Sequence, residues 1–208
     1  MSSQFESTKY FQHIMLLARE FKKSEAYTQA INLLIDCYLN QGTIYTMGCG
    51  GSASTATHFA ADLAKPTIIP GLRRFKAMAL VDNIPLVSAW TNDSGWGTVF
   101  AEQLRPWITD KDILIGFSVH GGGGKGDAGP WSQNLVQAMT LAKEKGSKII
   151  GFAGFDGGAM ARLADVPVIV PITDDVYGTP AIEAFHVVLH HGVIFELKER
   201  IKKYNIPQ

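Results

Sequence analysis

The chain has 208 residues, with 19 basic and 19 acidic side chains and therefore a formal net charge of zero. Hydrophobic residues make up 46% and charged residues 18%, which excludes disorder as the main state and fits one domain with a sizeable core. The balanced charge argues against a broad basic surface, so we expect no nucleic-acid partner.

Cysteine usage and hydropathy indicate the compartment. Cys37 and Cys49 belong to no paired-cysteine motif, which favours reducing surroundings. The N-terminal stretch mixes charges with short apolar patches, unlike a secretory signal, and no run of about 18 apolar residues occurs. We expect a cytoplasmic protein with no membrane partner.

The first part of the chain is helical in pattern. Residues 3–40 carry apolar side chains at helical spacing in two runs, which predict two helices ended by the stop signal at 40–42. Beyond it, short β-rich runs alternate with helical runs. We therefore separate a helical oligomerisation segment, residues 1–42, from an α/β domain, residues 43–208.

The alternation of strands and helices predicts the fold class. Strands are expected to begin near residues 43, 76, 112, 148 and 166. Helices are expected over 52–65, 85–90, 97–107, 131–145, 158–164 and 181–203. With right-handed crossovers, this order gives a doubly wound αβα sandwich around a five-stranded parallel sheet.

The long terminal helix, residues 181–203, is unusually apolar. From 181 to 197 its charged residues are Glu183 and Glu196, and apolar side chains surround it. A helix of this kind is buried on every side, and in a small domain a second subunit would supply the cover. We expect a homo-oligomer with this helix and the N-terminal pair at its interface.

Ligands of open parallel sheets bind where the strands end, and three loops are expected there: 48–52, 91–96 and 118–131. In the first, Gly50 and Gly51 would let the backbone approach an anion, and Ser52 adds a hydroxyl at a helix N-terminus. It matches neither dinucleotide nor Walker loops, and a tight turn without a ligand explains it equally well. The third, SVHGGGGKGDAGPW, would offer a cationic contact through Lys125, or is a plain flexible loop.

Titratable side chains gather on two of the predicted helices. His58 and Asp62 are four residues apart and share a face. The terminal helix adds Glu183, His186, His190 and His191. Such sets suit a divalent metal or acid–base catalysis, although a hydrogen-bonded core histidine and an Asp62–Lys65 pair are the alternatives. Burying so many polar groups is costly unless they have partners.

At this point a family resemblance adds to the residue patterns. The stretch GCGGSASTATHFAADL resembles GNGGSAADAQHFAAEL of the phosphoheptose (sedoheptulose 7-phosphate) isomerases, in the sugar isomerase (SIS) superfamily. Four further blocks follow in the same order: SAWTNDSGW resembles AIANDYGY, DILIGFSVHGG resembles DVLIGISTSGN, GFAGFDGGAMARLADVPVIVP resembles ALTGRDGGKLAPLADVELRVP, and IEAFHVVLHH resembles IQEVHLLIGH. Together they cover nearly the whole chain.

The resemblance implies a tetramer of αβα subunits whose interface active sites bind a sugar phosphate, with residues 43–208 as the SIS domain. It also implies zinc in some members, with ligands at His58, Asp62, Glu183 and His191. The acid–base pair matches Asp62 and His191, with Glu183 as a competing base. The substrate-binding residues expected on all these grounds are Gly50, Gly51, Ser52, Asn92, Asp93, Ser118, His120 and Lys125.

Several departures from the resembling blocks concern the substrate. Asp62 is shorter than the glutamate of the block, and Glu183 replaces a glutamine. Val119 and His120 replace hydroxyl residues in the phosphate loop, before an insertion rich in glycine. Further differences are Cys49 for asparagine and Pro180 for aspartate; Ser132 and Arg73 are alternative phosphate contacts.

Two functions compete. The first is an aldose–ketose isomerase of heptose biosynthesis that converts sedoheptulose 7-phosphate by enediol proton transfer, with Asp62 as base, His191 as partner and Zn²⁺ or backbone N–H groups as electrophile. The second is a non-catalytic SIS-fold sensor or scaffold, such as a replication-initiator-associating protein. The first requires His58 and Asp62 to meet Glu183 and His191 across a seam between chains, beside a pocket.

Overall fold

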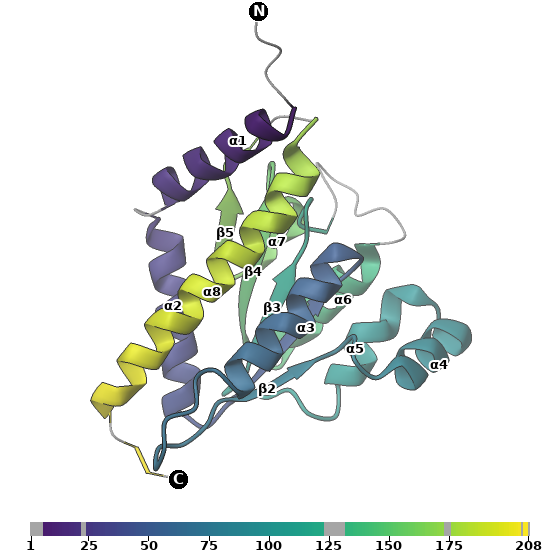
Figure 1. The fold of residues 1–208 in the computed structure, drawn as a ribbon. Helices are drawn as coiled ribbons and strands as arrows, with labels where there is room; N and C mark the ends of the chain where they lie inside the picture. Colours follow the sequence, from purple (N-terminus) through teal and green to yellow (C-terminus); the bar gives the residue numbers. More distant parts are fainter. Residues whose placement is uncertain (1–5, 22–23, 123–131, 173–175, 205, 208) are drawn as a thin grey trace, which may run out of the picture.

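A single five-stranded sheet forms the centre of the computed structural model, which describes residues 6–21, 24–122, 132–172, 176–204 and 206–207. The strands are β1 (Thr43–Gly48), β2 (Lys76–Ala79), β3 (Ile113–Phe117), β4 (Lys148–Gly154) and β5 (Val166–Val170). All neighbours are parallel, in the order β2-β1-β3-β4-β5. The predicted doubly wound α/β fold is therefore confirmed (Figure 1).

The strand order reverses between β1 and β3, which creates the crevice where such sheets bind ligands. Gly48 at the end of β1 pairs in register with Phe117 at the end of β3. The loops that follow these two strands therefore leave the sheet side by side.

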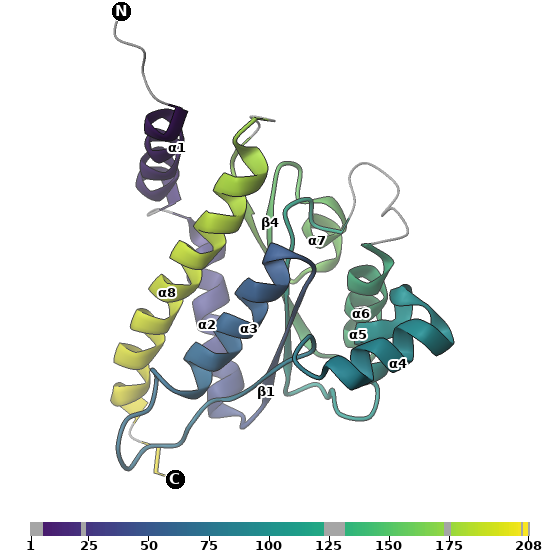
Figure 2. The ribbon, with the colours of Figure 1, turned by 45° about the vertical axis from the view of Figure 1, so that its right-hand side comes forward.

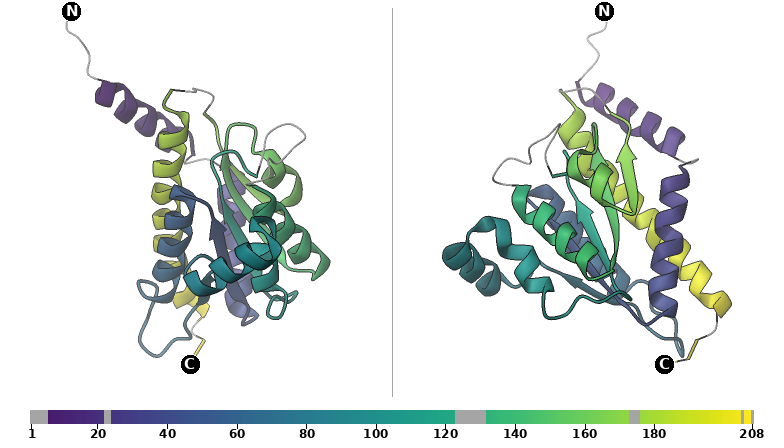
Figure 3. Two further views of the ribbon diagram at one scale, coloured as in Figure 1. Left: turned by 90° about the vertical axis from the view of Figure 1, so that its right-hand side faces the viewer. Right: turned by 180° about the vertical axis from the view of Figure 1, so that it is seen from behind.

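Helices cover both faces of the sheet. They are α1 (Glu6–Phe21), α2 (Glu25–Leu39), α3 (Gly51–Ala64), α4 (Ile84–Ser94), the 3₁₀ turn η1 (Trp96–Thr98), α5 (Val99–Leu104), α6 (Gln133–Glu144), α7 (Gly158–Leu163) and α8 (Gly178–Tyr204). One core packs α2, α3 and α8 on the sheet, and a second packs α5, α6 and α7 on the opposite face (Figure 3). Alternate residues of β3, such as Leu114 and Ile115, contribute to different cores because strand side chains alternate between faces.

One predicted loop is wrong, because α4 continues through it. The expected loop at 91–96 is helical up to Ser94. Asn83 caps the helix by accepting a hydrogen bond from the Leu86 N–H at 3.1 Å, and the helix ends only at Gly95, whose φ is +86°. The stop signal is thus the glycine and not the polar residues before it.

The apolar surface of α8 is covered on one side only by this chain. Leu189 and Val193 are buried, whereas Val188 is 47% and Phe195 75% exposed. On α1, Phe11, Met15 and Leu16 are exposed as well. None of the helices in the described ranges is long and apolar enough to cross a membrane.

Candidate active site

The glycine loop after β1 turns sharply into α3. A Cβ on Gly48 would lie 2.3 Å from the Ser52 carbonyl oxygen, and Gly50 has a φ of +59°, so only glycine fits both positions without strain. Ser52, which is 3% exposed, lies in the first turn of α3. The loop therefore brings its backbone and one hydroxyl to the end of β1.

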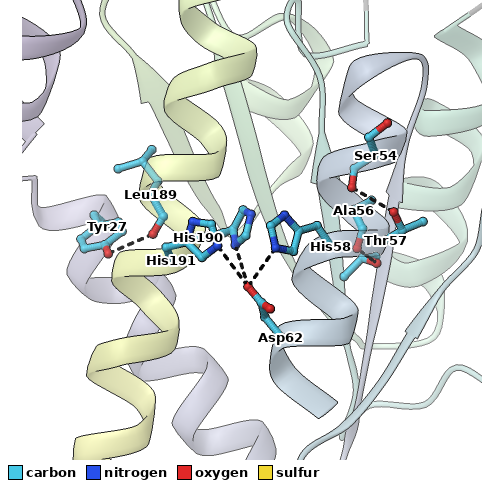
Figure 4. Close-up of polar contacts among 10 residues, drawn as sticks. Tyr27, Ser54, Ala56, Thr57, His58, Asp62, Leu189, His190 and His191 are labelled. Atoms are coloured by element: carbon cyan, nitrogen blue, oxygen red, sulfur yellow. Dashed lines mark hydrogen bonds and ion pairs between the residues drawn. The ribbon is translucent and has the colours of Figure 1, made fainter. Parts of the chain in front are cut away.

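Further along α3, four titratable side chains from two helices meet. His58 and Asp62 lie on α3, and His190 and His191 lie on α8, which packs against α3 in the same chain (Figures 1 and 2). One ligand atom from each residue lies within 4.8 Å of those from the others. Figure 4 shows the three imidazole rings pointing at the Asp62 carboxylate. Contrary to the expectation of a seam between chains, a single chain forms this cluster.

The cluster has dimensions that suit a metal ion. Oδ2 of Asp62 lies 3.5 Å from Nε2 of His58, 3.7 Å from Nδ1 of His190 and 3.4 Å from Nε2 of His191. In a tetrahedral zinc site with bonds of about 2.1 Å, ligand atoms lie about 3.4 Å apart. Three imidazoles and one carboxylate are also zinc-type donors, so these residues fit such an ion.

Burial keeps one member of the cluster neutral. His190 is fully buried, and desolvation, followed by the nearby imidazoles of His191, His58 and His186, lowers the pKa of His190 to about 3. Neither of its ring nitrogens has a hydrogen-bond partner among the described residues. A buried neutral imidazole without partners is costly, and a metal ion would satisfy one of its nitrogens.

The outer part of the cluster faces solvent. The side chains of His58 and His191 are 48% and 44% exposed, whereas that of Asp62 is 15% exposed. A ligand can therefore approach Asp62 from the side of the two exposed imidazoles.

Glu183 lies apart from this cluster. A Cβ on Gly51 would lie 2.6 Å from its Oε1, so the carboxylate occupies the space above the first turn of α3. Glu183 precedes His191 by eight residues on the same helix, or about 12 Å at 1.5 Å per residue. The structure thus brings together three of the four residues that the resemblance gave as metal ligands, with His190 where Glu183 was expected.

The loop after β3 lies beside the glycine loop. The Ser118 N–H donates to the Phe152 carbonyl oxygen at 3.0 Å, and Ser118 is half-buried at the end of β3. His120 is exposed two residues later. Both residues are therefore at the crevice where an anion was predicted to bind.

The remaining predicted site residues do not join the cluster in this chain. Asn92 and Asp93 lie on α4, where the Asn92 amide donates to the Asp93 carboxylate at 2.7 Å. This helix lies on the far side of α3 from α8 (Figures 1 and 2). Lys125 lies outside the described residues.

None of the cluster residues lines a hollow that lies nearby between α3 and β2. A hollow of about 540 Å³ lies between α3 and the edge strand β2, with Ala61, Met78 and Trp107 in its lining. Asp82 is its single titratable lining residue, so the hollow lacks the groups that proton transfer needs.

The sequence analysis placed His190 among the titratable side chains of the terminal helix, but it gave the ligand position to His191. The adjacent pair His190 and His191 was the available signal for His190. Neighbouring residues of a helix point about 100° apart, so both imidazoles can flank one carboxylate. His186 is also fully buried, and desolvation, opposed by a backbone contact with Ala153, lowers its pKa to about 4.

Comparison with known proteins gives a consistent set of matches. A family model described as SIS domain matches residues 9–154. Lincomycin biosynthesis protein LmbN of Streptomyces lincolnensis is 48% identical over 77% of this chain, which spans only 58% of LmbN. A phosphoheptose isomerase of Helicobacter pylori strain P12 is 36% identical over 80% of both chains. The structure of phosphoheptose isomerase GmhA from Neisseria gonorrhoeae superposes with a TM-score of 0.79 at 28% identity, covering 93% of this chain and 97% of that one.

Proposed function

Because the chain belongs to the SIS domain family, and within it to the phosphoheptose isomerase family, we propose that it is an aldose–ketose isomerase of a sugar phosphate. The observation that carries this proposal is the cluster of His58, Asp62, His190 and His191 on α3 and α8. A half-buried carboxylate surrounded by imidazoles supplies the base and the acid that proton transfer between two carbons requires.

The proposed proton transfer uses groups with different exposure. The carboxylate of Asp62 takes the proton from the carbon next to the carbonyl, and His191, with Nε2 3.4 Å away, supplies or receives the proton at oxygen. His190 is neutral because its pKa is about 3, so it is not the acid. Glu183 is the competing base, but its position two helical turns from His191 favours Asp62.

The cluster also supports a role for zinc. His58, Asp62, His190 and His191 would hold Zn²⁺, which when bound would polarise a substrate oxygen. In that case His191 would hold the ion through one ring nitrogen and exchange the proton through the other, and the exposed sides of His58 and His191 leave room for substrate.

The substrate would extend along α3 from the cluster to the glycine loop. Ser52 and His58 are six residues apart, which is about 9 Å along the helix. Its phosphate would lie near Gly50, Gly51, Ser52, Ser118 and His120, at the positive end of α3. An extended sugar phosphate of several carbons spans this separation, and sedoheptulose 7-phosphate is the substrate we propose first.

Assembly and compartment complete the proposal. A homotetramer, with residues 1–42 in its interface, would cover the exposed apolar side chains of α1 and α8. A neighbouring copy could then bring its own Asn92 and Asp93 to the site. Both cysteines are free, which is consistent with a cytoplasmic setting.

A scaffold or sensor without catalysis is the second candidate. The hydroxyl-free positions Val119 and His120, together with the high identity to a protein of lincomycin biosynthesis, favour a changed ligand. The buried His190, whose ring nitrogens have no hydrogen-bond partner among the described residues, counts against a purely structural role, because it costs stability.

Turnover tests the proposal directly. Purified protein is assayed with ketose phosphates of seven carbons and with shorter and longer ones, with and without a chelator, beside Asp62→Asn. The matched control is Asp36→Asn, the same change on the exposed face of α2. We expect the unmodified protein to form an aldose from at least one substrate. Asp62→Asn should abolish this turnover, and Asp36→Asn should leave it unchanged. Absence of turnover across the series, with retained sugar-phosphate binding, would favour the scaffold.

A further inference from the structure

The segment that follows β3 is tied to β4 and α7 on both sides of His120. Three backbone hydrogen bonds do this: Ser118 N–H to the Phe152 carbonyl (3.0 Å), Gly154 N–H to the Val119 carbonyl (3.0 Å) and Met160 N–H to the Gly121 carbonyl (2.8 Å). His120 therefore projects from a backbone that is fixed before and after it.

The imidazole of His120 is itself held by an aromatic ring from the loop that follows β4. The rings of His120 and Phe155 are stacked, with centroids 4.7 Å apart and planes 9° apart. His120 is exposed, while Phe155 is half-buried beneath it. Stacking leaves the edge of the imidazole, with its two nitrogens, free to meet a ligand.

Phe155 keeps this position in an unfavourable backbone conformation. Its φ is +50°, which is rare for a bulky residue and is found where the surroundings impose it. Its ring fills the space above Gly178 at the start of α8, where a Cβ would lie 2.6 Å from Cζ of Phe155. The ring is thus wedged between Gly178 and His120.

We propose that Phe155 is a positioning residue that fixes the imidazole of His120 to bind the phosphate end of the substrate. This inference rests on the proposed function, because it assumes a phosphorylated sugar. Phe155 stands where the resembling block GRDGG has arginine, and His120 stands where a hydroxyl residue is found. The stacked pair would supply one oriented imidazole N–H where the block has a hydroxyl residue.

Steady-state kinetics test the positioning role. Phe155→Leu removes the ring, and we expect the KM for the sugar phosphate to rise about tenfold with kcat changed less than about twofold, because a ground-state contact is lost. Phe155→Tyr keeps the stack and should restore KM to within about twofold. The matched control is Phe75→Leu, which removes a ring centred 4.7 Å from Tyr38 at the other end of the sheet and should leave KM unchanged.

A double-mutant cycle separates positioning from general damage. If Phe155 acts through His120, the variant Phe155→Leu/His120→Ala has the same KM as His120→Ala alone. An unchanged KM in Phe155→Leu, or multiplicative effects of the two changes, would overturn the proposal.

Magnetic resonance tests the pair without turnover, including the case in which Phe155→Leu does not fold. In the unmodified protein the His120 ring protons should be shifted upfield by the Phe155 ring, and inorganic phosphate or sedoheptulose 7-phosphate should move them further. If the His120 protons respond to these ligands in a protein that shows no turnover, the isomerase proposal is wrong and the positioning role of Phe155 stands. His120 protons at ordinary positions, or indifferent to both ligands, would contradict the positioning role.

Discussion

On α3 and α8, four titratable side chains lie within 4.8 Å of one another, whereas at the ends of β3 and β4 the expected phosphate contacts are Ser118 and a stacked His120. The first group projects from helices that are packed over several turns. The second projects from loops, whose sequence can change without disturbing the core. The comparison teaches that the two parts of the proposed site are held in different ways: packed helices fix the histidine cluster, whereas loops carry the proposed phosphate contacts.

The largest effect is expected at the proton-transfer end. His191→Ala should lower turnover at least about 10³-fold, because it removes the proposed partner of the Asp62 carboxylate. Circular dichroism and size-exclusion chromatography should show an unchanged fold and assembly. Turnover within about tenfold of the unmodified protein would remove His191 from the mechanism.

The second prediction concerns His190, which lies in the cluster but has no assigned counterpart in the resembling ligand set. If it binds the metal, His190→Ala should weaken zinc affinity by about 100-fold, measured by competition with a chelating dye. His13→Ala, a histidine change on α1, is the control and should leave zinc affinity unchanged. Equal zinc affinity in His190→Ala and the unmodified protein would show that His190 does not bind the metal, and Glu183 would then be the candidate for the fourth ligand.

The third prediction tests the buried His186, which lies on α8 but is not part of the cluster. Its folded pKa is about 4, below the ordinary 6.5, so between these values the unfolded chain binds more protons and stability falls as pH falls. The unmodified protein should therefore lose stability relative to His186→Phe as the pH falls from about 6 to about 4.

Urea unfolding of both proteins across this pH range measures the difference. His186 packs 5.9 Å from the Phe117 ring and 6.2 Å from the Phe152 ring, so phenylalanine suits its apolar surroundings. Parallel stability curves for the two proteins would show that His186 is not neutral in the fold.

The smallest effect is expected from Glu183 at the loop end. Its carboxylate lies above the first turn of α3, where the substrate phosphate is proposed to bind. Glu183→Gln removes a like charge and should lower the KM for the sugar phosphate by about fivefold, with a smaller effect at high salt. A raised KM would instead show that the carboxylate binds the sugar hydroxyls.

Sequence patterns sufficed for the fold because strands such as DILIGFS and the helix stop at 40–42 are local signals. They failed at 91–94, where capping by Asn83 and the stop at Gly95 outweighed a run of poor helix formers. In the site, the four-residue spacing of His58 and Asp62 was enough to place them on one face.

The pairing of that face with His190 could not be predicted, since it depends on how α8 is rotated against α3. The separation of Glu183 from His191 could have been predicted, because eight helical residues span about 12 Å. The stack of His120 on Phe155 joins loops 35 residues apart and a backbone with positive φ, neither of which a sequence pattern reveals.

Isotope exchange tests the central claim most directly. The protein is incubated in D₂O with the ketose phosphate, and deuterium at the carbon next to the carbonyl is followed by magnetic resonance. The account predicts exchange with the unmodified protein and its loss in Asp62→Asn. Undiminished exchange in Asp62→Asn, or none with the unmodified protein on any ketose phosphate, would contradict it.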